Sequence, residues 1–332
     1  MKICVVGAGA IGGWMGVKLA LAGHTVSVLA RGATLAAIQA NGLQMVMGGE
    51  TLRAQVAASV SAADIDTPDL LIIAVKAPAM RDAALSVKSL IGPNTMVLTA
   101  MNGVPWWFFA RADRPLHGTQ LTTIDATGDI NASIPAANVI GCVVHAACGV
   151  DAPGVIRHKV GQRLIIGEPS GGAQSVAPGG ASARVTALHE ALIAAGFASE
   201  LSTDIQRDVW FKLWGNMTMN PVSAITGATT DKILADELTR EFCSNVMREA
   251  QMIGNQIGIP IEQTPDARHA VTQKLGAMKT SMLQDVEANK SIELDALVAA
   301  VREIGQRVGV ATPYTDAMLG LTRLMARERG LY

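Results

Sequence analysis

The 332-residue sequence lacks an excess of charge of either sign and has no long hydrophobic run. Its formal net charge is −1 and only 17% of its residues are charged, so it offers no basic stripe to neutralise the phosphates of a nucleic acid. The longest apolar runs, such as residues 69–75, have the length of a strand, whereas about 18 apolar residues are needed to span a bilayer. We therefore expect neither a nucleic acid nor a membrane as partner.

Paired cysteines and clustered metal ligands are also missing. The four cysteines form no CxxC pair, and the six histidines show no ligand spacing, so we expect no metal. We interpret the cysteines as free thiols in a reducing compartment. The first residues carry one lysine and then a glycine-rich turn in place of a signal-peptide pattern, which favours a cytoplasmic protein.

What the sequence does contain is enough apolar material for large cores. Hydrophobic residues make up 49% of the chain, which excludes intrinsic disorder. A chain of this length is expected to form about two domains.

Strand and helix patterns alternate along the first 200 residues. Buried-strand patterns occupy residues 2–6, 25–30, 70–76 and 95–103, a strand pair at 42–47 and 51–56 surrounds a Gly-Gly turn, and helices are expected at 11–23 and 78–90. Strands separated by helices predict a doubly wound α/β sheet.

The next part of the chain reads as short strands and then turns wholly helical. We expect strands at 117–125, 139–147, 154–160 and 162–168, a surface loop at 168–181, a helix at 182–195 and a strand at 197–202. Helices are expected at 204–220, with Asp204 as N-cap and an end at Pro221, and near 232–258, 264–278, 291–308 and 315–329. The expected domains are therefore 1–203 and 204–332.

A glycine-rich motif directly follows the first predicted strand and opens the first predicted helix. It is a GxGxxG formed by Gly7, Ala8, Gly9, Ala10, Ile11 and Gly12. In that context the glycines permit a tight turn, approach of the backbone to a pyrophosphate, and close helix–strand packing. The helix N-terminus then faces the phosphates with unpaired N–H groups. The motif therefore predicts a dinucleotide cofactor.

The end of the second predicted strand distinguishes between cofactors. NAD sites usually place an acidic residue there to bind the ribose 2′-hydroxyl. This sequence has no carboxylate at that point and instead has Arg31, a residue suited to a 2′-phosphate. We therefore predict NADP(H).

Three polar residues form a stripe on the helix expected at 204–220. Lys212, Asn216 and Asn220 follow one another at intervals of four, so they lie along one side of the helix. Burying them among apolar neighbours would be costly unless they converge on something polar. In a cleft, Lys212 can act as a general acid toward a carbonyl oxygen. The alternative is a surface lysine with an apolar stem, beside two asparagines near a helix end.

Two further candidates follow sheet strands. Asn102 and Lys76 stand at the carboxyl ends of predicted strands, where doubly wound sheets bind their ligands.

These motifs together resemble the ketopantoate reductase (2-dehydropantoate 2-reductase) family over nearly the whole chain. The residues that carry the resemblance are GxGAxG at 7–12, Lys76 in VKA, Asn102 in NG, KLWGNMTMNPVSAI at 212–225 and SMLQD…IELDAL at 281–297. The resemblance implies an α/β Rossmann-type N-terminal domain and an all-α C-terminal domain like that of 6-phosphogluconate dehydrogenase. It also implies NADPH-dependent reduction of 2-dehydropantoate to (R)-pantoate in pantothenate biosynthesis.

The resemblance further implies a role for each matching residue. Lys212 would protonate the keto oxygen, and Glu293 would hydrogen-bond the substrate hydroxyl. Asn216, Asn220 and Ser281 would bind the substrate, with Ser281 near its carboxylate. On the cofactor side, Asn102 would hold the nicotinamide ribose or the substrate, Lys76 would contact the cofactor ribose or the substrate, and Arg31 would bind the 2′-phosphate.

Three features depart from the family pattern. Met101 stands where many relatives have histidine, residues 106–109 are four consecutive aromatics, and residues 117–140 resemble an insertion, such as an added hairpin. We interpret the aromatics as core packing of a following helix; the alternative is an aromatic wall that reshapes the substrate pocket.

Other functions therefore stay open beside the main prediction. They are an NADP-dependent reductase of another small 2-keto acid, a dehydrogenase of a hydroxy acid or amine working in the oxidative direction, and a non-enzymatic NADPH sensor. The apolar helical domain fits a homodimer interface or an internal core equally well.

Overall fold

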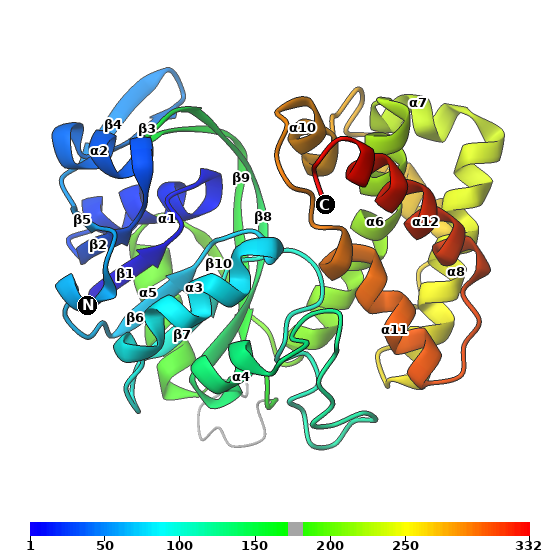
Figure 1. Ribbon diagram of the computed structural model, residues 1–332, viewed down its shortest axis with the longest axis horizontal. Helices are drawn as coiled ribbons and strands as arrows, with labels where there is room; N and C mark the ends of the chain where they lie inside the picture. Colours follow the sequence, from blue (N-terminus) through cyan, green and yellow to red (C-terminus); the bar gives the residue numbers. More distant parts are fainter. Residues whose placement is uncertain (172–181) are drawn as a thin grey trace. The chain divides into compact units, whose positions relative to one another are not determined.

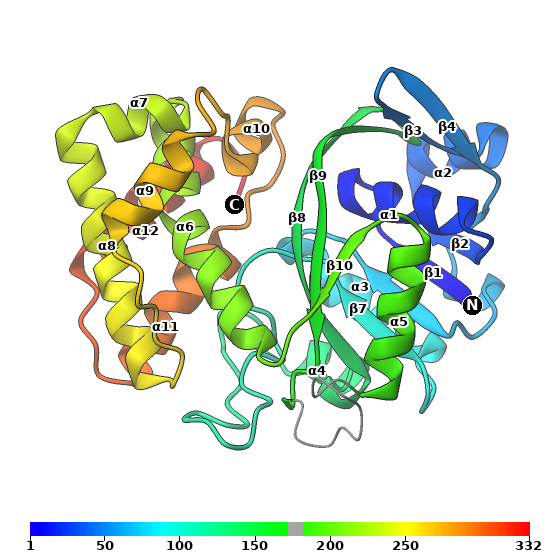
Figure 2. The same cartoon turned by 180° about the vertical axis from the view of Figure 1, so that it is seen from behind.

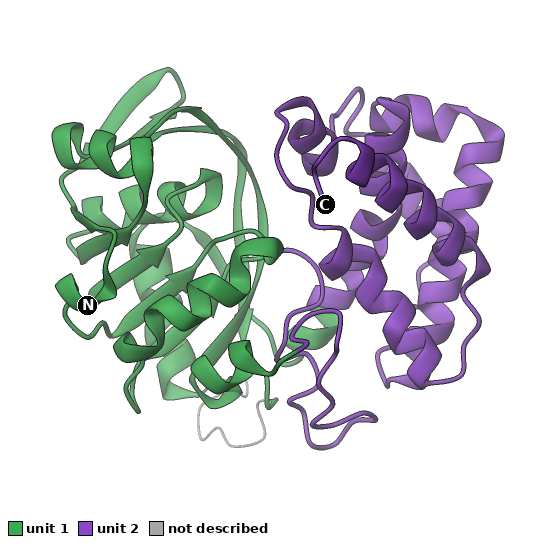
Figure 3. Cartoon of the chain, in the orientation of Figure 1, with its two compact units in different colours: residues 1–101, 127–208 green, residues 102–126, 209–332 purple. Residues whose placement is uncertain are grey.

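The computed structural model describes residues 1–171 and 182–332, which form two compact units (Figure 3). Unit 1 comprises residues 1–101 and 127–208, and unit 2 comprises residues 102–126 and 209–332. This division differs from the two continuous segments expected from the sequence, because residues 102–126 belong with the helical unit. The loop expected at 168–181 lies mostly outside the described residues.

Unit 1 is built on a ten-stranded sheet in the order β4-β3-β9-β8-β7-β6-β1-β2-β5, with β10 paired to β9. Its strands are β1 Lys2–Val6, β2 Thr25–Leu29, β3 Leu43–Met47, β4 Glu50–Ala54, β5 Ala57–Ser59, β6 Leu70–Ile73, β7 Met96–Thr99, β8 Val139–Ala152, β9 Val155–Gly167 and β10 Ala198–Leu201. The central strands β2, β1, β6 and β7 pair in parallel. The apolar sequences of β6 and β7 are explained by burial, since both strands are buried at every position.

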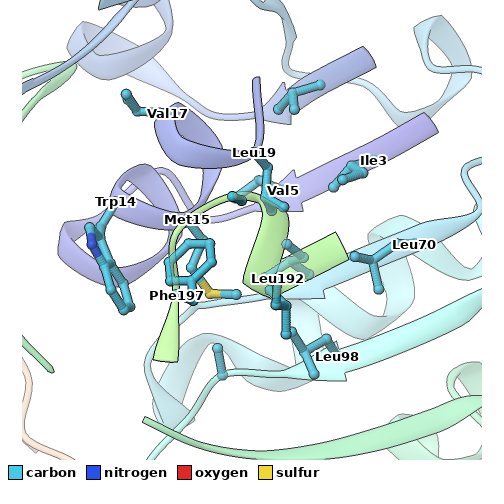
Figure 4. Packing of buried hydrophobic residues seen from close by; sticks show 14 of the residues in the cluster. Ile3, Val5, Trp14, Met15, Val17, Leu19, Leu70, Leu98, Leu192 and Phe197 are labelled. Atoms are coloured by element: carbon cyan, nitrogen blue, oxygen red, sulfur yellow. The ribbon is translucent and has the colours of Figure 1, made fainter. Parts of the chain in front are cut away.

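Helices cover both faces of this sheet (Figures 1 and 2). The helices of unit 1 are α1 Ala10–Leu21, α2 Gly32–Asn41, α3 Met80–Val87, α4 Asp129–Ser133 and α5 Ala183–Ala194. The core on the face of α1 and α5 joins Met15, Leu192 and Phe197 to the sheet residue Val5 (Figure 4). Trp14 meets the Phe197 ring edge-on, with centroids 4.9 Å apart. This core fixes the helix that follows the glycine motif.

Several strand predictions between residues 115 and 167 were wrong. Residues 117–125 form turns instead of a strand. The three short strands expected after them are two long antiparallel strands, β8 and β9, whose register shifts at bulges. Bulges interrupt the alternation of side chains, so one long strand looks like several short ones in the sequence. The suggested hairpin within 117–140 is also absent, since this stretch contains turns and the short helix α4.

Unit 2 is helical. Its helices are α6 Ile205–Thr226, which begins in unit 1, α7 Thr230–Ala235, α8 Glu237–Gln256, α9 Pro265–Gln273, α10 Ser281–Glu287, a π-helix Asp295–Ala299, α11 Ala300–Arg307 and α12 Pro313–Glu328. Asp204 accepts a bond from Arg207 N at 3.2 Å, as expected of an N-cap. The expected end of α6 at Pro221 was wrong, because the helix continues to Thr226. Proline removes one backbone bond, and burial of Val222 and Ala224 holds the helix beyond it.

Residues 102–126 are attached to unit 2 by carboxylate–backbone bonds. The Glu303 carboxylate on α11 accepts from the backbone N–H groups of Thr122 and Thr123 at 2.9 and 2.8 Å, and from the Thr123 hydroxyl at 2.6 Å. Arg307 donates to Gln120 O at 3.2 Å. These bonds explain why a segment that follows a sheet strand belongs to the helical unit.

Candidate functional site

The glycine motif of unit 1 forms a turn in which two of its glycines are sterically required. Gly7 has φ +92°, and a Cβ there would lie 2.8 Å from the Val75 side chain. A Cβ on Gly12 would lie 2.1 Å from Gly7 O. Gly9 is different, because a Cβ there would have nothing within 4 Å. Gly7 and Gly12 therefore serve the turn, while the open space beside Gly9 fits close approach of a ligand to the backbone.

The first turn of α1 leaves backbone donors available. Gly9 is the N-cap of α1 and provides no side-chain capping bond. The first N–H groups of a helix have no partner within it and favour an anion. The motif residues Ala8, Ala10 and Ile11 complete this strand–turn–helix. The geometry fits a dinucleotide pyrophosphate.

Arg31 and Lys76 follow strands β2 and β6 of the same sheet. Arg31 is exposed, stands at the N-cap of α2 and makes no ion pair with any residue that the structure describes. Its guanidinium is therefore accessible to a phosphate. Lys76 is half-buried at the start of a short 3₁₀-helix, Ala77–Ala79. Cofactor contacts of both residues stay predictions.

In unit 2, the structure brings Lys212 and Asn102 together. Lys212 Nζ on α6 donates to Asn102 Oδ1 at 2.8 Å, although the two residues are 110 positions apart. Both side chains are half-buried. A fixed acceptor restricts a long, flexible lysine, so the amine is oriented by a defined partner. This bond favours the interpretation of Lys212 as part of a site over that of a surface lysine beside two asparagines near a helix end.

Two turns further along α6 toward its C-terminus, the side chain of Asn220 bonds that of Ser281. Asn220 Nδ2 donates to Ser281 Oγ at 3.3 Å. Ser281 is the first residue of α10, whose N-cap Thr280 accepts a bond from Leu283 N at 3.2 Å. Asn216 lies one turn before Asn220 and is half-buried. The polar stripe of α6 thus provides two amides and an amine in one row, with a hydroxyl beside them.

Glu293 precedes the π-helix and is half-buried. Its backbone carbonyl accepts from Leu297 N at 3.2 Å. The π-helix itself was missed by the sequence analysis, since neither spacing nor composition distinguishes it from an α-helix.

Arg268 is a further residue that the sequence analysis missed. Its guanidinium lies 5.3 Å from the centre of the Phe211 ring, and a Cβ on Gly215 would lie 3.0 Å from its Nη2. Burial lowers the pKa of the Arg268 guanidinium, because desolvation disfavours the charged form. Gly215 therefore gives this cation room to pack against α6.

The four aromatics at 106–109 are core residues of unit 2. All are at most 9% exposed. The Phe108 ring meets Phe109 edge-on at 5.2 Å and lies 5.9 Å from Trp210 on α6. The interpretation as core packing is confirmed, but the expected helix is wrong, because these residues form a turn.

The residues that the structure describes contain neither a cluster of metal ligands nor a helix that could span a membrane. No group of three or more His, Cys, Asp or Glu residues there is arranged to hold a metal ion. None of the helices described is both long and apolar enough to cross a membrane.

Comparison with known proteins agrees with the fold described above. A family model described as "Ketopantoate reductase PanE/ApbA" matches residues 3–171, and its C-terminal counterpart matches residues 204–326. A 2-dehydropantoate 2-reductase of Mesorhizobium japonicum is 45% identical over 333 residues, which cover 100% of both chains. A solved structure described as a candidate ketopantoate reductase of Ralstonia solanacearum MolK2 is 54% identical, with a TM-score of 0.95 over 100% of this chain and 99% of the other.

A third similarity concerns the fold alone. A D-mandelate dehydrogenase solved with NADH and anilino(oxo)acetate has a TM-score of 0.83 over 99% of this chain and 100% of the other, at 21% identity.

These relatives define the class as oxidoreductases that act on CH–OH groups. Within that class, the chain belongs to the ketopantoate reductase family.

Proposed function

We propose that this protein reduces 2-dehydropantoate to (R)-pantoate with NADPH, a step of pantothenate biosynthesis. The observation that carries the proposal is the bond from Lys212 Nζ to Asn102 Oδ1 at 2.8 Å, which orients an amine in the row of polar groups on α6. The 45% identical relative named for this activity supports the same substrate.

Reduction of a keto acid needs a hydride and a proton. The hydride for the keto carbon would come from NADPH when that cofactor is bound. The Lys212 ammonium gives its proton to the keto oxygen as negative charge develops there, and the proton is replaced from solvent afterwards. Asn102 holds the amine in place, and its amide N–H₂ group remains available to the nicotinamide ribose or the substrate.

The other polar residues of unit 2 match the remaining groups of the substrate. Ser281 Oγ and the amides of Asn220 and Asn216 provide donors for a carboxylate. Glu293 accepts a hydrogen bond from the substrate hydroxyl. A site built to bond a hydroxyl discriminates against substrates that lack one.

We assign the choice between NADPH and NADH to Arg31. Lys76 contacts the cofactor ribose or the substrate. Arg31 is exposed after β2 and has no carboxylate partner among the residues described. A guanidinium binds a phosphate through two parallel bonds. We therefore propose NADPH over NADH.

The test is oxidation of NADPH, followed at 340 nm, with 2-dehydropantoate and a panel of other 2-keto acids, each repeated with NADH. We expect kcat/KM with 2-dehydropantoate and NADPH to exceed every other combination at least tenfold. Comparable or faster turnover of another keto acid would refute the proposed substrate, and a preference for NADH would refute the role of Arg31.

A second candidate is a reductase of a different small 2-keto acid. The observation in its favour is the packing of Phe108 against Trp210, whose ring centroids lie 5.9 Å apart. Trp210 stands two residues before Lys212 on α6, so the aromatic segment affects the part of the helix that carries the amine. The same keto-acid panel distinguishes the two substrates.

A non-enzymatic sensor would bind NADPH without turning over any member of the panel.

Homodimerisation stays a separate proposal, which light scattering tests against the chain mass of 34.6 kDa.

A further inference from the structure

The turn that carries Asn102 lies directly against the π-helix of unit 2. Gly103 has φ +85°, and a Cβ there would lie 2.6 Å from both the Cβ and the carbonyl oxygen of Ala296. Val104 N donates to that same carbonyl oxygen at 2.8 Å. Gly103 is thus required both by its left-handed conformation and by the closeness of Ala296.

Ala296 has little room to change. It is 2% exposed and is the second residue of the π-helix Asp295–Ala299. A single π turn widens the helix locally, and such turns are frequent at functional sites. In this helix, the widened turn is the part that meets Gly103 and Val104.

We infer that Ala296 is a positioning residue, which holds Asn102 at hydrogen-bond distance from Lys212. Its methyl group and its carbonyl fix Gly103 and Val104, the two residues that follow Asn102. The inference rests on the proposed function, in which Lys212 is the proton donor.

The physical reason is that the lysine side chain cannot position itself. Its four-carbon stem is flexible, so the bond to Asn102 Oδ1 helps to locate the amine. Misplacement of a reacting group by about 1 Å can reduce a rate about a hundredfold. A larger side chain at position 296 would displace the turn and, with it, the acceptor.

The test is a double-mutant cycle of Ala296→Val with Asn102→Ala. Ala299→Val is the matched control, since Ala299 lies in the same π turn but is half-buried beside Thr122, Glu303 and Leu319. We expect Ala296→Val to lower kcat for 2-dehydropantoate at least tenfold, and Ala299→Val to change it less than twofold. When Asn102 is already alanine, Ala296→Val should change kcat less than twofold, because the acceptor that it positions is gone. Multiplicative losses in the double mutant would overturn the inference.

A structural readout separates this inference from the proposed function. In a crystal structure of the Ala296→Val protein, the distance from Lys212 Nζ to Asn102 Oδ1 should exceed 3.5 Å; an unchanged distance of 2.8 Å would overturn the inference. If the unmodified protein reduces no keto acid, the proposed function fails, and this distance still decides the positioning role. Should Ala296→Val not fold, Ala296→Ser adds a single atom, and we expect about a threefold loss of kcat that Asn102→Ala again suppresses.

Discussion

Lys212 is half-buried and donates to the Asn102 amide oxygen, so its removal should affect the chemical step more than binding. We expect Lys212→Ala to lower kcat about 10²- to 10⁴-fold, the usual contribution of a general acid, with less than a twofold change in the Kd for NADPH. Steady-state kinetics and a fluorescence titration with NADPH measure the two effects. Lys232→Ala, at an exposed lysine of α7, is the control and should change neither.

Arg31 should distinguish the two nicotinamide cofactors. Without its guanidinium, the 2′-phosphate loses a charged partner, while NADH has no such phosphate. We expect Arg31→Ala to raise KM for NADPH about tenfold and KM for NADH less than twofold. Arg53→Ala, at an exposed arginine of β4, provides the comparison. Equal changes for both cofactors would contradict the assignment.

Lys18 should make the stability of the protein rise with pH in the alkaline range. Its Nζ lies 2.6 Å from Gly196 O and 4.5 Å from the centre of the Phe197 ring, and it also bonds Gln162. Burial lowers the pKa of Lys18, whereas in the unfolded chain the value is about 10.4. Between these two values the unfolded chain binds more protons, so stability rises with pH.

Chemical denaturation from pH 7 to pH 10.5 measures this effect. The unfolding free energy of the unmodified protein should increase relative to that of Lys18→Met, which lacks the titrating group. A constant difference across this range would contradict the expectation.

At the level of elements, a buried carboxylate secures the start of α12. Glu249 on α8 is 3% exposed and accepts from the backbone N–H groups of Tyr314 and Thr315, both at 2.8 Å, and from the Thr315 hydroxyl at 2.6 Å. Its removal would leave these donors without their acceptor, and those of Thr315 are fully buried. We expect Glu249→Ala to reduce the free energy of unfolding by about 3 kcal/mol, measured by urea denaturation. Glu241→Ala, at an exposed position of the same helix, should change it by less than about 0.5 kcal/mol.

The elements differ in how far the sequence predicts them. β1 and the Gly48-Gly49 strand pair follow directly from apolar runs and turn chemistry. The helix expected at 232–258 is divided at Asp236, which caps α8 by accepting from Thr239 N at 2.8 Å. Helices α2 and α10 were not expected, because α2 buries only Ile38 and α10 has seven residues. Helices this short contain few residues from which a periodic pattern can be recognised, and they depend on packing for their stability.

For the whole molecule, nucleotide binding should appear as thermal stabilisation. A ligand present at 100 times its Kd adds about 2.7 kcal/mol to the stability of a protein, and NADPH should therefore raise Tm. A Cβ on Gly9 meets nothing within 4 Å, so Gly9→Val should fold normally and yet block approach of the pyrophosphate. We expect an unchanged Tm without nucleotide and no increase with NADPH, measured by calorimetry.

Gly320→Ala is the control for this experiment. Gly320 lies in α12, and a Cβ there also meets nothing within 4 Å. This variant should keep the full increase of Tm with NADPH. A normal increase of Tm with NADPH for Gly9→Val would show that the glycine motif is not part of the binding site.

The sequence by itself determined the fold class, and it predicted most of the residues proposed for the candidate site. Apolar runs, helical periodicity and the glycine turn are local patterns, and local patterns report burial and backbone conformation directly. The intervals of four between Lys212, Asn216 and Asn220 also put these residues in one row along a helix.

Only the tertiary structure decided which of these residues meet. The bond between Lys212 and Asn102 joins positions 110 apart, and the contact of Ala296 with Gly103 joins a π-helix to a turn that follows a sheet strand. The same holds for residues 102–126, which follow β7 in the chain and yet belong to the helical unit. Such contacts are set by the packing of whole elements, because side-chain volume and backbone hydrogen bonds are satisfied between segments that no local pattern relates.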